Sequence, residues 1–172
     1  MKKFQTTTRL LNIKTSFGLF GVEANKYGVC SLNLPNKPKI ESLKDIDRLT
    51  AIKKHLIQAK KELEEYFSGK RKVFNLKVHL NSEPLFYLNV LEIVQKIPYA
   101  KTLSYKDIAS ELNNKKAVRA VGSANAQNPI PIIIPCHRVI LSNGKDGNYG
   151  GGKSLKKRLI NHEKQYHLSS NV

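Results

Sequence analysis

Apolar and polar residues alternate along residues 9–34, which is the pattern of half-buried β-strands. Leu11 and Ile13 alternate with polar neighbours in the first part of this stretch. Residues 25–28, Asn-Lys-Tyr-Gly, have the composition of a turn. We therefore predict antiparallel strands here, and we place Cys30 on the apolar side of the last strand, in the core.

The spacing of apolar residues then changes to a helical period. Residues 48–67 carry lysines and glutamates opposite one apolar face, which is made by Leu49, Ile52, Leu56, Leu63 and Phe67. Asp45 or Asp47 is suited to cap the start of this helix, and Ser68-Gly69 to end it.

Residues 70–84 are expected to close a first domain. They predict a further strand over residues 73–80, followed by the polar stretch Asn81-Ser82-Glu83-Pro84. We place a domain boundary in this polar stretch.

The pattern beyond the boundary is helical. A stripe of apolar residues over 86–97 predicts a helix that Pro98 ends. Ser104 and Asp107 form a capping-box-like start for a second, short helix. A third helix is predicted over about residues 115–125.

The third helix is rich in small residues. One face is expected to carry Ala117, Ala120, Val121 and Ala124, and another face Arg119 and Ser123. Two short helices around a tight break, the second one basic, are typical of a helix-turn-helix. Many helical hairpins share this pattern.

A final helix contains an acidic residue in an unusual place. Ser154 is suited to cap this helix, and Glu163 follows Leu155 and Leu159 along the apolar stripe instead of facing water. Negative charge near a helix C-terminus also opposes the macrodipole. A carboxylate there needs a partner, and a histidine is a plausible one. The alternative is a solvated glutamate on a frayed helix end.

The composition is ordinary for a folded domain except in its charge. The 172 residues include 30 Lys and Arg against 13 Asp and Glu, a net charge of +17. Polyanions, and nucleic acid first among them, are the natural partners of such a surface. The excess is spread evenly, at +10 over residues 1–81 (17 basic, 7 acidic) and +7 over residues 82–172 (13 basic, 6 acidic). Charge alone therefore locates no binding face.

Cysteine usage and hydropathy suggest a compartment. No apolar run approaches the roughly 18 residues of a membrane span, and no signal-peptide pattern opens the chain. Two cysteines without a CxxC motif exclude a disulfide scaffold and a cysteine-rich zinc site. We expect a cytoplasmic protein that binds no membrane, metal or cofactor.

Cys136 is the strongest candidate for chemistry. Three isoleucines between prolines precede it and predict a buried extended segment, with Cys136 on a rigid, non-helical backbone. A thiol is nucleophilic only as thiolate, and His137 or Arg138 is placed to lower its pKa. With Glu163, Cys136 and His137 would form a nucleophile, a base and an orienter. The alternative is a structural cysteine, because neighbours on extended backbone point to opposite faces.

Residues 85–163 resemble the active-site domain of the O6-alkylguanine-DNA alkyltransferases, the single-use repair proteins that remove alkyl groups from guanine. The matching motifs are Ile97-Pro98, Thr102-Leu103-Ser104-Tyr105, Ile108-Ala109, Arg119-Ala120-Val121-Gly122-Ser123-Ala124-Asn125, Asn128-Pro129, Ile134-Pro135-Cys136-His137-Arg138-Val139-Ile140, Gly147-Asn148-Tyr149 and Glu163. Residues 1–81 resemble the family's N-terminal domain more loosely, through Ser16-Phe17-Gly18 and Glu65-Tyr66-Phe67-Ser68-Gly69-Lys70.

The resemblance implies an α+β fold in two domains. Residues 1–81 would form a small β-sheet-plus-helix domain of the RNase H-like kind, and residues 82–172 a mostly α-helical domain with the helix-turn-helix. It also implies that the protein is a methylated-DNA–protein-cysteine S-methyltransferase. The alkyl group of O6-alkylguanine in double-stranded DNA would pass to Cys136, and the protein would be consumed. We expect a monomer.

The resemblance further implies roles for single residues. The recognition helix would enter the minor groove, and the damaged base would leave the stack, because its O6 substituent is inaccessible inside a duplex. His137 would accept the thiol proton through water, Glu163 would steady the imidazole, and Tyr105 would protonate the leaving guanine. Asn128 would brace the hinge before the cysteine. The base would be held by Tyr149, Pro131, Gly150 and backbone groups near Val139. DNA would be contacted by Arg119, Ala117, Ser123 and Tyr105, with Arg119 filling the gap in the stack.

Two departures from the family pattern concern the pocket and the packing. Members often carry serine where this chain has Gly150, so a backbone N–H contact to O6 survives but a hydroxyl contact does not. Leu91 stands where many members have tryptophan. Some relatives bind zinc through N-terminal cysteines and histidines, whereas only Cys30 is present in that part of this chain.

Two other functions are compatible with the same residues. One is a non-catalytic relative that binds alkylated DNA and recruits repair factors, although such proteins lack the reactive cysteine. The other is a basic nucleic-acid-binding module with a structural Cys-His pair.

Overall fold

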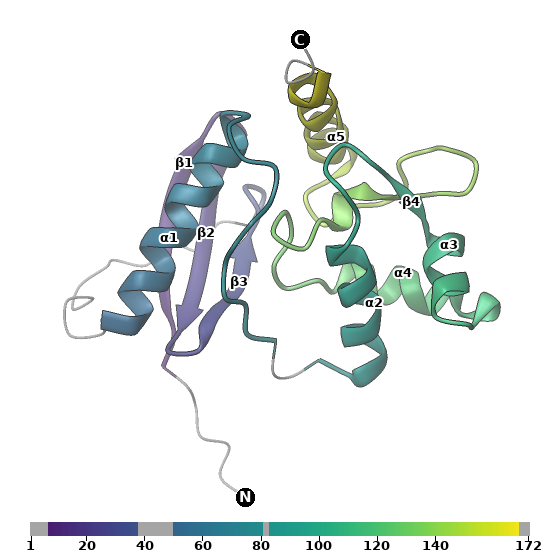
Figure 1. The fold of residues 1–172 in the computed structure, drawn as a ribbon, viewed down its shortest axis with the longest axis horizontal. Helices are drawn as coiled ribbons and strands as arrows, with labels where there is room; N and C mark the ends of the chain where they lie inside the picture. The colour runs from purple at the N-terminus through teal and green to yellow at the C-terminus, as the bar shows by residue number, and fades with distance from the viewer. Residues whose placement is uncertain (1–6, 38–49, 81–82, 169–172) are drawn as a thin grey trace, which may run out of the picture. The chain divides into compact units, whose positions relative to one another are not determined.

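The computed structural model describes residues 7–37, 50–80 and 83–168. The chain divides into two compact units, Met1–Leu80 and Asn81–Val172, each of which is described by itself (Figure 1). Two residues of the predicted boundary, Asn81 and Ser82, lie outside the described residues.

The first unit is a three-stranded antiparallel sheet covered on one face by a helix (Figure 1). The strands are β1 (Arg9–Thr15), β2 (Gly18–Asn25) and β3 (Gly28–Asn33), in the order β1-β2-β3. Helix α1 (Thr50–Phe67) buries Ile52, Leu56 and Leu63. The predicted strands and helix are confirmed. The predicted caps Asp45 and Asp47, and Leu49 of the apolar face, lie outside the described residues.

The expectation that Cys30 lies in the core is wrong. The pairing of β2 with β3 shifts register between Glu23, which pairs with Ser31, and Ala24, which pairs with Val29. Cys30 is therefore the extra residue of a β-bulge, which breaks the alternation that the sequence pattern assumes. Its side chain is only half-buried, and its thiol lies 3.5 Å from the carbonyl of Glu23.

The strand predicted over residues 73–80 is also absent. Only Val78 bridges the sheet, opposite Val29. Side chains of α1 satisfy part of this segment's backbone instead. Asn75 N–H donates to Glu62 Oε2 at 2.8 Å, and Gln58 Nε2 donates to the Asn75 carbonyl at 3.1 Å. The segment is thus held by side chains and does not extend the sheet.

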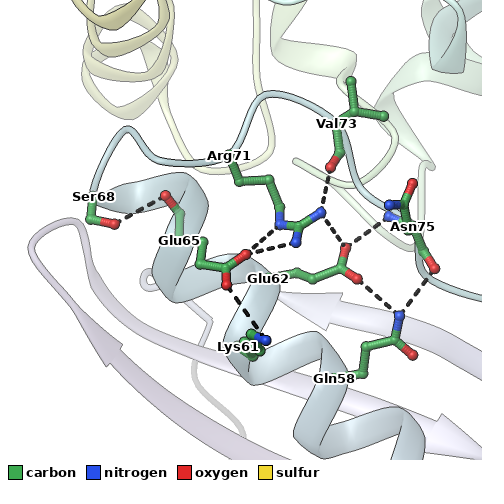
Figure 2. A network of polar contacts seen from close by, with 8 residues as sticks. All are labelled: Gln58, Lys61, Glu62, Glu65, Ser68, Arg71, Val73 and Asn75. Atoms are coloured by element: carbon green, nitrogen blue, oxygen red, sulfur yellow. Dashed lines mark hydrogen bonds and ion pairs between the residues drawn. The ribbon is translucent and has the colours of Figure 1, made fainter.

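Arg71 is the centre of this polar network (Figure 2). Its Nε donates to Glu65 Oε2 at 2.7 Å, and its Nη1 lies 3.5 Å from Oε2 of Glu62, a carboxylate that is 3% exposed. Nη1 also donates to the carbonyl of Val73 at 2.9 Å. The guanidinium therefore pairs with the buried Glu62 carboxylate and holds residues 71–75 against α1.

We expect Arg71→Met to lower the free energy of unfolding by about 2–4 kcal/mol, because it leaves Glu62 charged, buried and without its cation. Urea unfolding measures this loss. The matched control is Lys61→Met, which removes an exposed lysine 4.0 Å from the same Glu65 and should change stability by less than about 0.5 kcal/mol. Equal effects of the two substitutions would contradict the structural role of Arg71.

The second unit is mostly helical, as predicted. Its helices are α2 (Leu85–Gln95), α3 (Tyr105–Glu111), α4 (Val118–Ala126) and α5 (Lys153–Leu168). Single 3₁₀ turns occupy Lys115–Ala117 and Cys136–Arg138. Two short parallel strands, β4 (Leu103–Ser104) and β5 (Val139–Ile140), pair Ser104 with Ile140. None of the helices among the described residues is long and apolar enough to cross a membrane.

Helices α3 and α4 form the predicted helix-turn-helix. Ser104 caps α3 through a capping box, in which Asp107 N–H donates to Ser104 Oγ and Ser104 N–H donates to Asp107 Oδ2. The expected face of α4 is partly wrong, because Ala120 is exposed. The helix begins only at Val118, and its buried side is set by Val121, Ala124 and Asn125. Ala120 lies one residue, or about 100°, away from that side.

The isoleucine run before Cys136 is buried, but it is not extended. Ile132 has φ of 74°, and Ile134 N–H donates to the Ile130 carbonyl at 2.9 Å, which closes a turn. Cys136 then begins a 3₁₀ turn, so the expectation of a non-helical backbone is wrong as well. The side chain of Asn128 stabilises this path, since it donates to the Ile134 carbonyl and accepts from Ile130 N–H. A bulky residue in this left-handed conformation is costly and needs such support.

Candidate active site

Cys136 lies in the second unit, at the start of the 3₁₀ turn that precedes β5. Its 3₁₀ turn runs directly into β5, and β5 pairs with β4, whose last residue caps α3. This pairing joins the start of α3, at Tyr105, to the strand that follows the cysteine turn. The thiol side chain is 4% exposed. Burial raises the pKa of Cys136 to about 11, while Asn128 and the charge of Lys156 act in the opposite direction. The thiol is therefore protonated at neutral pH and needs a base.

His137, the residue that follows Cys136, forms a buried pair with Glu163. Nε2 of His137 lies 2.7 Å from Oε1 of Glu163, and both side chains are at most 1% exposed. A carboxylate can only accept, so Nε2 carries the proton and Nδ1 is the basic nitrogen of the neutral ring. Burial lowers the pKa of His137, against the effect of Glu163. The imidazole is thus neutral at pH 7, as a base must be.

Glu163 is held by more than its histidine. Arg138 donates from Nε to Oε2 at 2.9 Å and from Nη2 to Oε1 at 2.9 Å, and Ala100 N–H donates to Oε2 at 3.0 Å. Ala100 turns its N–H toward the carboxylate with a positive φ of 60°. Burial alone would raise the pKa of Glu163, but His137 and Arg138 hold it well below its usual range. Glu163 is therefore a carboxylate throughout the physiological pH range.

The sequence offers Arg138 as a cation for the thiol, but in the structure its guanidinium binds Glu163 and the Ile97 carbonyl. Its Nη1 donates to the Ile97 carbonyl at 2.6 Å, and the guanidinium lies 5.6 Å from the centre of the Tyr99 ring. Together with its hydrogen bonds to Glu163, these contacts fix the position of the carboxylate.

Lys156 is the residue that sequence reasoning missed. It is completely buried, and its Nζ donates to the Val139 carbonyl at 2.5 Å. Burial lowers the pKa of Lys156, while Cys136 and Asp146 act to raise it. The signal was present in the sequence, because Lys156 precedes Glu163 by seven residues and so shares its face of α5. It supplies the positive charge near the thiol that Arg138 does not.

The other residues predicted to hold the base differ in how deeply they are buried. Tyr105 is half-buried, and burial raises its pKa. The Tyr149 hydroxyl is buried and has no hydrogen-bond partner among the described residues, and burial raises its pKa well above the usual value. Pro131 and Val139 are buried, whereas Gly150 is exposed. Their roles toward a base stay predictions.

A pocket of about 460 Å³ opens between α3, α4 and the chain after β5. It is lined by Tyr105, Val118, Arg119, Gly122, Ser123, Leu141 and Asn148. Three of the predicted DNA-contacting residues therefore meet at one cavity. The fourth, Ala117, is buried and does not line it. Across the described ranges, no three His, Cys, Asp or Glu side chains gather in a way that could hold a metal ion.

Comparison with known proteins matches both units. The family described as 6-O-methylguanine DNA methyltransferase, DNA binding domain, matches residues 85–165, and the ribonuclease-like domain of the same family matches residues 10–80.

Individual relatives agree with this match. A methylated-DNA–protein-cysteine methyltransferase of Methanosarcina barkeri is 40% identical over 150 residues, 86% of this chain and 92% of that protein. The constitutive enzyme of that name from Bacillus subtilis is 44% identical over 111 residues, 64% of this chain and 67% of that one. The crystal structure of Mycobacterium tuberculosis OGT in complex with DNA superimposes with a TM-score of 0.77 at 31% identity, covering 92% and 93% of the two chains. This chain belongs to the 6-O-methylguanine DNA methyltransferase family.

Proposed function

We propose that this protein repairs DNA by transferring the alkyl group of O6-alkylguanine to Sγ of its own Cys136. The observation that carries the proposal is the buried His137–Glu163 hydrogen bond at the residue that follows the buried Cys136. Membership of the family supports the reaction. This chain also retains the cysteine that a purely lesion-binding relative would not need.

The transfer is a displacement at carbon. His137 Nδ1 takes the thiol proton through a water molecule, and Glu163 stabilises the resulting imidazolium. The thiolate forms an S–C bond to the alkyl carbon as the C–O6 bond breaks, and the electron pair of that bond stays on the purine. Tyr105 gives its proton to the purine, which leaves as neutral guanine, and the imidazolium proton then restores the tyrosine through solvent. A thioether has no easy route back to thiolate, so each molecule acts once.

The base reaches Cys136 by leaving the duplex, because its O6 substituent is otherwise stacked and paired. The surface that contacts DNA is formed by α3 and α4, around the pocket of about 460 Å³. Arg119 is exposed on α4, lines this pocket and enters the stack when the base leaves it.

Reaction with methylated duplex should add one methyl group to the protein, on Cys136 and not on Cys30. Only Cys136 has a base beside it, whereas the half-buried Cys30 thiol faces the Glu23 carbonyl. Intact mass measures the gain, and peptide mapping locates it. Alkylation of Cys30, or binding without any gain in mass, would refute the assignment. The second outcome would indicate the lesion-binding alternative.

Arg119→Ala should slow repair of a lesion in duplex DNA by about tenfold or more. Moving the base out of the stack costs a few kcal/mol, and Arg119 offsets part of this cost by filling the gap that the base leaves. Reaction with free benzylated guanine needs no flipping and should be nearly unchanged. Single-turnover rates at saturating duplex and on the free base give the comparison.

Lys116→Ala is the matched control for this prediction, because it removes an exposed cation next to the same helix that does not line the pocket. It should lower DNA affinity without lowering the saturated rate. Equal losses of Arg119→Ala on duplex and free base would mean that Arg119 supports the pocket instead.

The chemistry also suggests a compartment. Neither of the two described cysteines takes part in a disulfide, and the transfer uses a reduced Cys136. The cytoplasm, which keeps thiols reduced, is the location that we propose.

A further inference from the structure

Leu141 is an exposed apolar residue on a well-fixed backbone. It is the first residue after β5, and its side chain is 39% exposed. Its N–H donates to the Lys145 carbonyl at 2.9 Å, and its carbonyl accepts from Gly144 N–H at 3.0 Å. A Cβ added to Gly147 would lie 3.4 Å from Leu141 Cγ and 3.6 Å from Cε2 of Tyr105, so both side chains border the same glycine. The exposure of Leu141 is therefore set by a closed turn.

This leucine lines the pocket of about 460 Å³ next to α3 and α4. Tyr105 and Val118 add aromatic and aliphatic surface to the same wall, and Arg119 is the one cation among the described residues that line it. Single exposed leucines are common on protein surfaces and need no explanation. Leu168 on α5, which is 69% exposed and does not line this pocket, is of that kind. Leu141 differs because its exposed surface borders the same cavity as Arg119.

The chemistry of this wall indicates which part of DNA it fits. Phosphates are bound by cations, hydroxyl groups and N–H donors, and an aliphatic side chain offers them nothing. Proteins that bind the minor groove often combine a cation with apolar side chains that contact or enter the base stack. Arg119 on α4 and Leu141 after β5 border one pocket from two different elements. The apolar part of the wall thus matches base faces and deoxyribose better than phosphate.

We propose that Leu141 is a second DNA-contacting residue at the lesion, and that it packs on the bases or sugars bordering the position that the flipped guanine leaves. The proposal rests on the proposed function, because this gap forms only when the base has left the stack. The part of Leu141 that faces water in the free protein is then removed from water, which favours the flipped state. Leu141 therefore assists flipping and takes no part in the transfer of the alkyl group.

Leu141→Asn tests this role in the full-length protein, since it keeps the size of the side chain and replaces its methyl groups by an amide. Single-turnover repair of a methylated duplex at saturating DNA should slow by about tenfold, the order expected when the apolar surface of one leucine stays in water. Transfer from free benzylated guanine needs no flipping and should change by less than about twofold. Leu141→Met keeps the apolar surface and should repair the duplex within about twofold of the wild-type rate.

Salt dependence gives a second readout, which does not use the reaction. In the unreactive Cys136→Ser protein, adding Leu141→Asn should weaken binding of the methylated duplex. It should leave the slope of log affinity against log salt concentration unchanged, because no phosphate contact is lost. Loss of one phosphate contact would instead reduce that slope by about 0.9. A reduced slope would contradict an apolar contact.

Leu168→Asn is the matched control, because it makes the same substitution at an exposed leucine of the second unit that does not line the pocket. It should leave both rates and the affinity unchanged. Wild-type repair of the duplex by Leu141→Asn, or equal losses on duplex and free base, would overturn the proposal. If Leu141→Asn fails to fold, Leu141→Ser takes its place with the same expectations. A wild-type protein that reacts with neither substrate would overturn the proposed function itself, which is a different result from an active wild type that Leu141→Asn matches.

Discussion

Replacing Glu163 with glutamine is expected to slow alkyl transfer to Cys136 by about 10²–10⁴-fold, the usual worth of a positioned acid–base group. The carboxylate accepts from His137 Nε2 and so leaves Nδ1 as the base. A glutamine whose oxygen stays with Arg138 offers an N–H to the ring, which then carries its proton on the wrong nitrogen. Single-turnover transfer from free benzylated guanine measures the chemical step without DNA binding.

The structure adds a second effect to this substitution. Arg138 is buried against Glu163, so the loss of the charge also destabilises the fold. The observed rate constant separates the two effects, because unfolded molecules lower the amplitude of the reaction and not its rate constant. Glu92→Gln, which removes an exposed carboxylate on α2, is the control. An unchanged rate constant with Glu163→Gln would remove Glu163 from the mechanism.

Lys156→Met is expected to slow the same reaction by about 10–1,000-fold at neutral pH. A nearby opposite charge shifts a pKa by roughly one to three units, and each unit is tenfold in thiolate. The charge of Lys156 acts to lower the pKa of Cys136, so its removal should make the thiolate scarcer. The rate of Cys136 modification by iodoacetamide reports thiolate directly and should fall in parallel.

Stability distinguishes this effect from damage to the fold. Methionine fills the space of the lysine without a buried charge, and replacing buried charges by apolar residues is often neutral or stabilising. The unfolding midpoint of Lys156→Met should therefore not fall as its activity does. Lys157→Met changes the exposed neighbour on α5 and should alter neither property. If both lysine variants react at the wild-type rate, Lys156 is a structural residue only.

Much of the fold could be predicted because its signals are local. The alternation in residues 9–34, the apolar face of residues 52–67 and the capping box at Ser104 each specify an element that the structure contains. The position of Glu163 on an apolar stripe correctly indicated a buried carboxylate with a histidine partner.

The errors arise where specific hydrogen bonds, which apolar periodicity does not report, decide the backbone. Cys30 leaves the core because of a bulge opposite Glu23, and residues 73–80 form no strand because α1 side chains take part of their hydrogen bonds. The isoleucine run turns at Ile132 because Asn128 and the Ile130 carbonyl hold it. The pattern predicted the burial of the isoleucine run but not its turn, and it predicted the strand that holds Cys30 but not the half-burial of that residue.

The sequence by itself determined most of the helices and strands, the family, and Cys136 with His137 as the candidate nucleophile and base. Only the tertiary structure decided what surrounds these two residues. It turned Arg138 away from the thiol to fix Glu163, and it buried Lys156 beneath Val139. Apolar periodicity indicates which side of a helix or strand is buried, because burial follows from hydrophobicity. The orientation of a buried side chain and the charges around it depend on contacts between elements. A linear pattern does not contain these contacts.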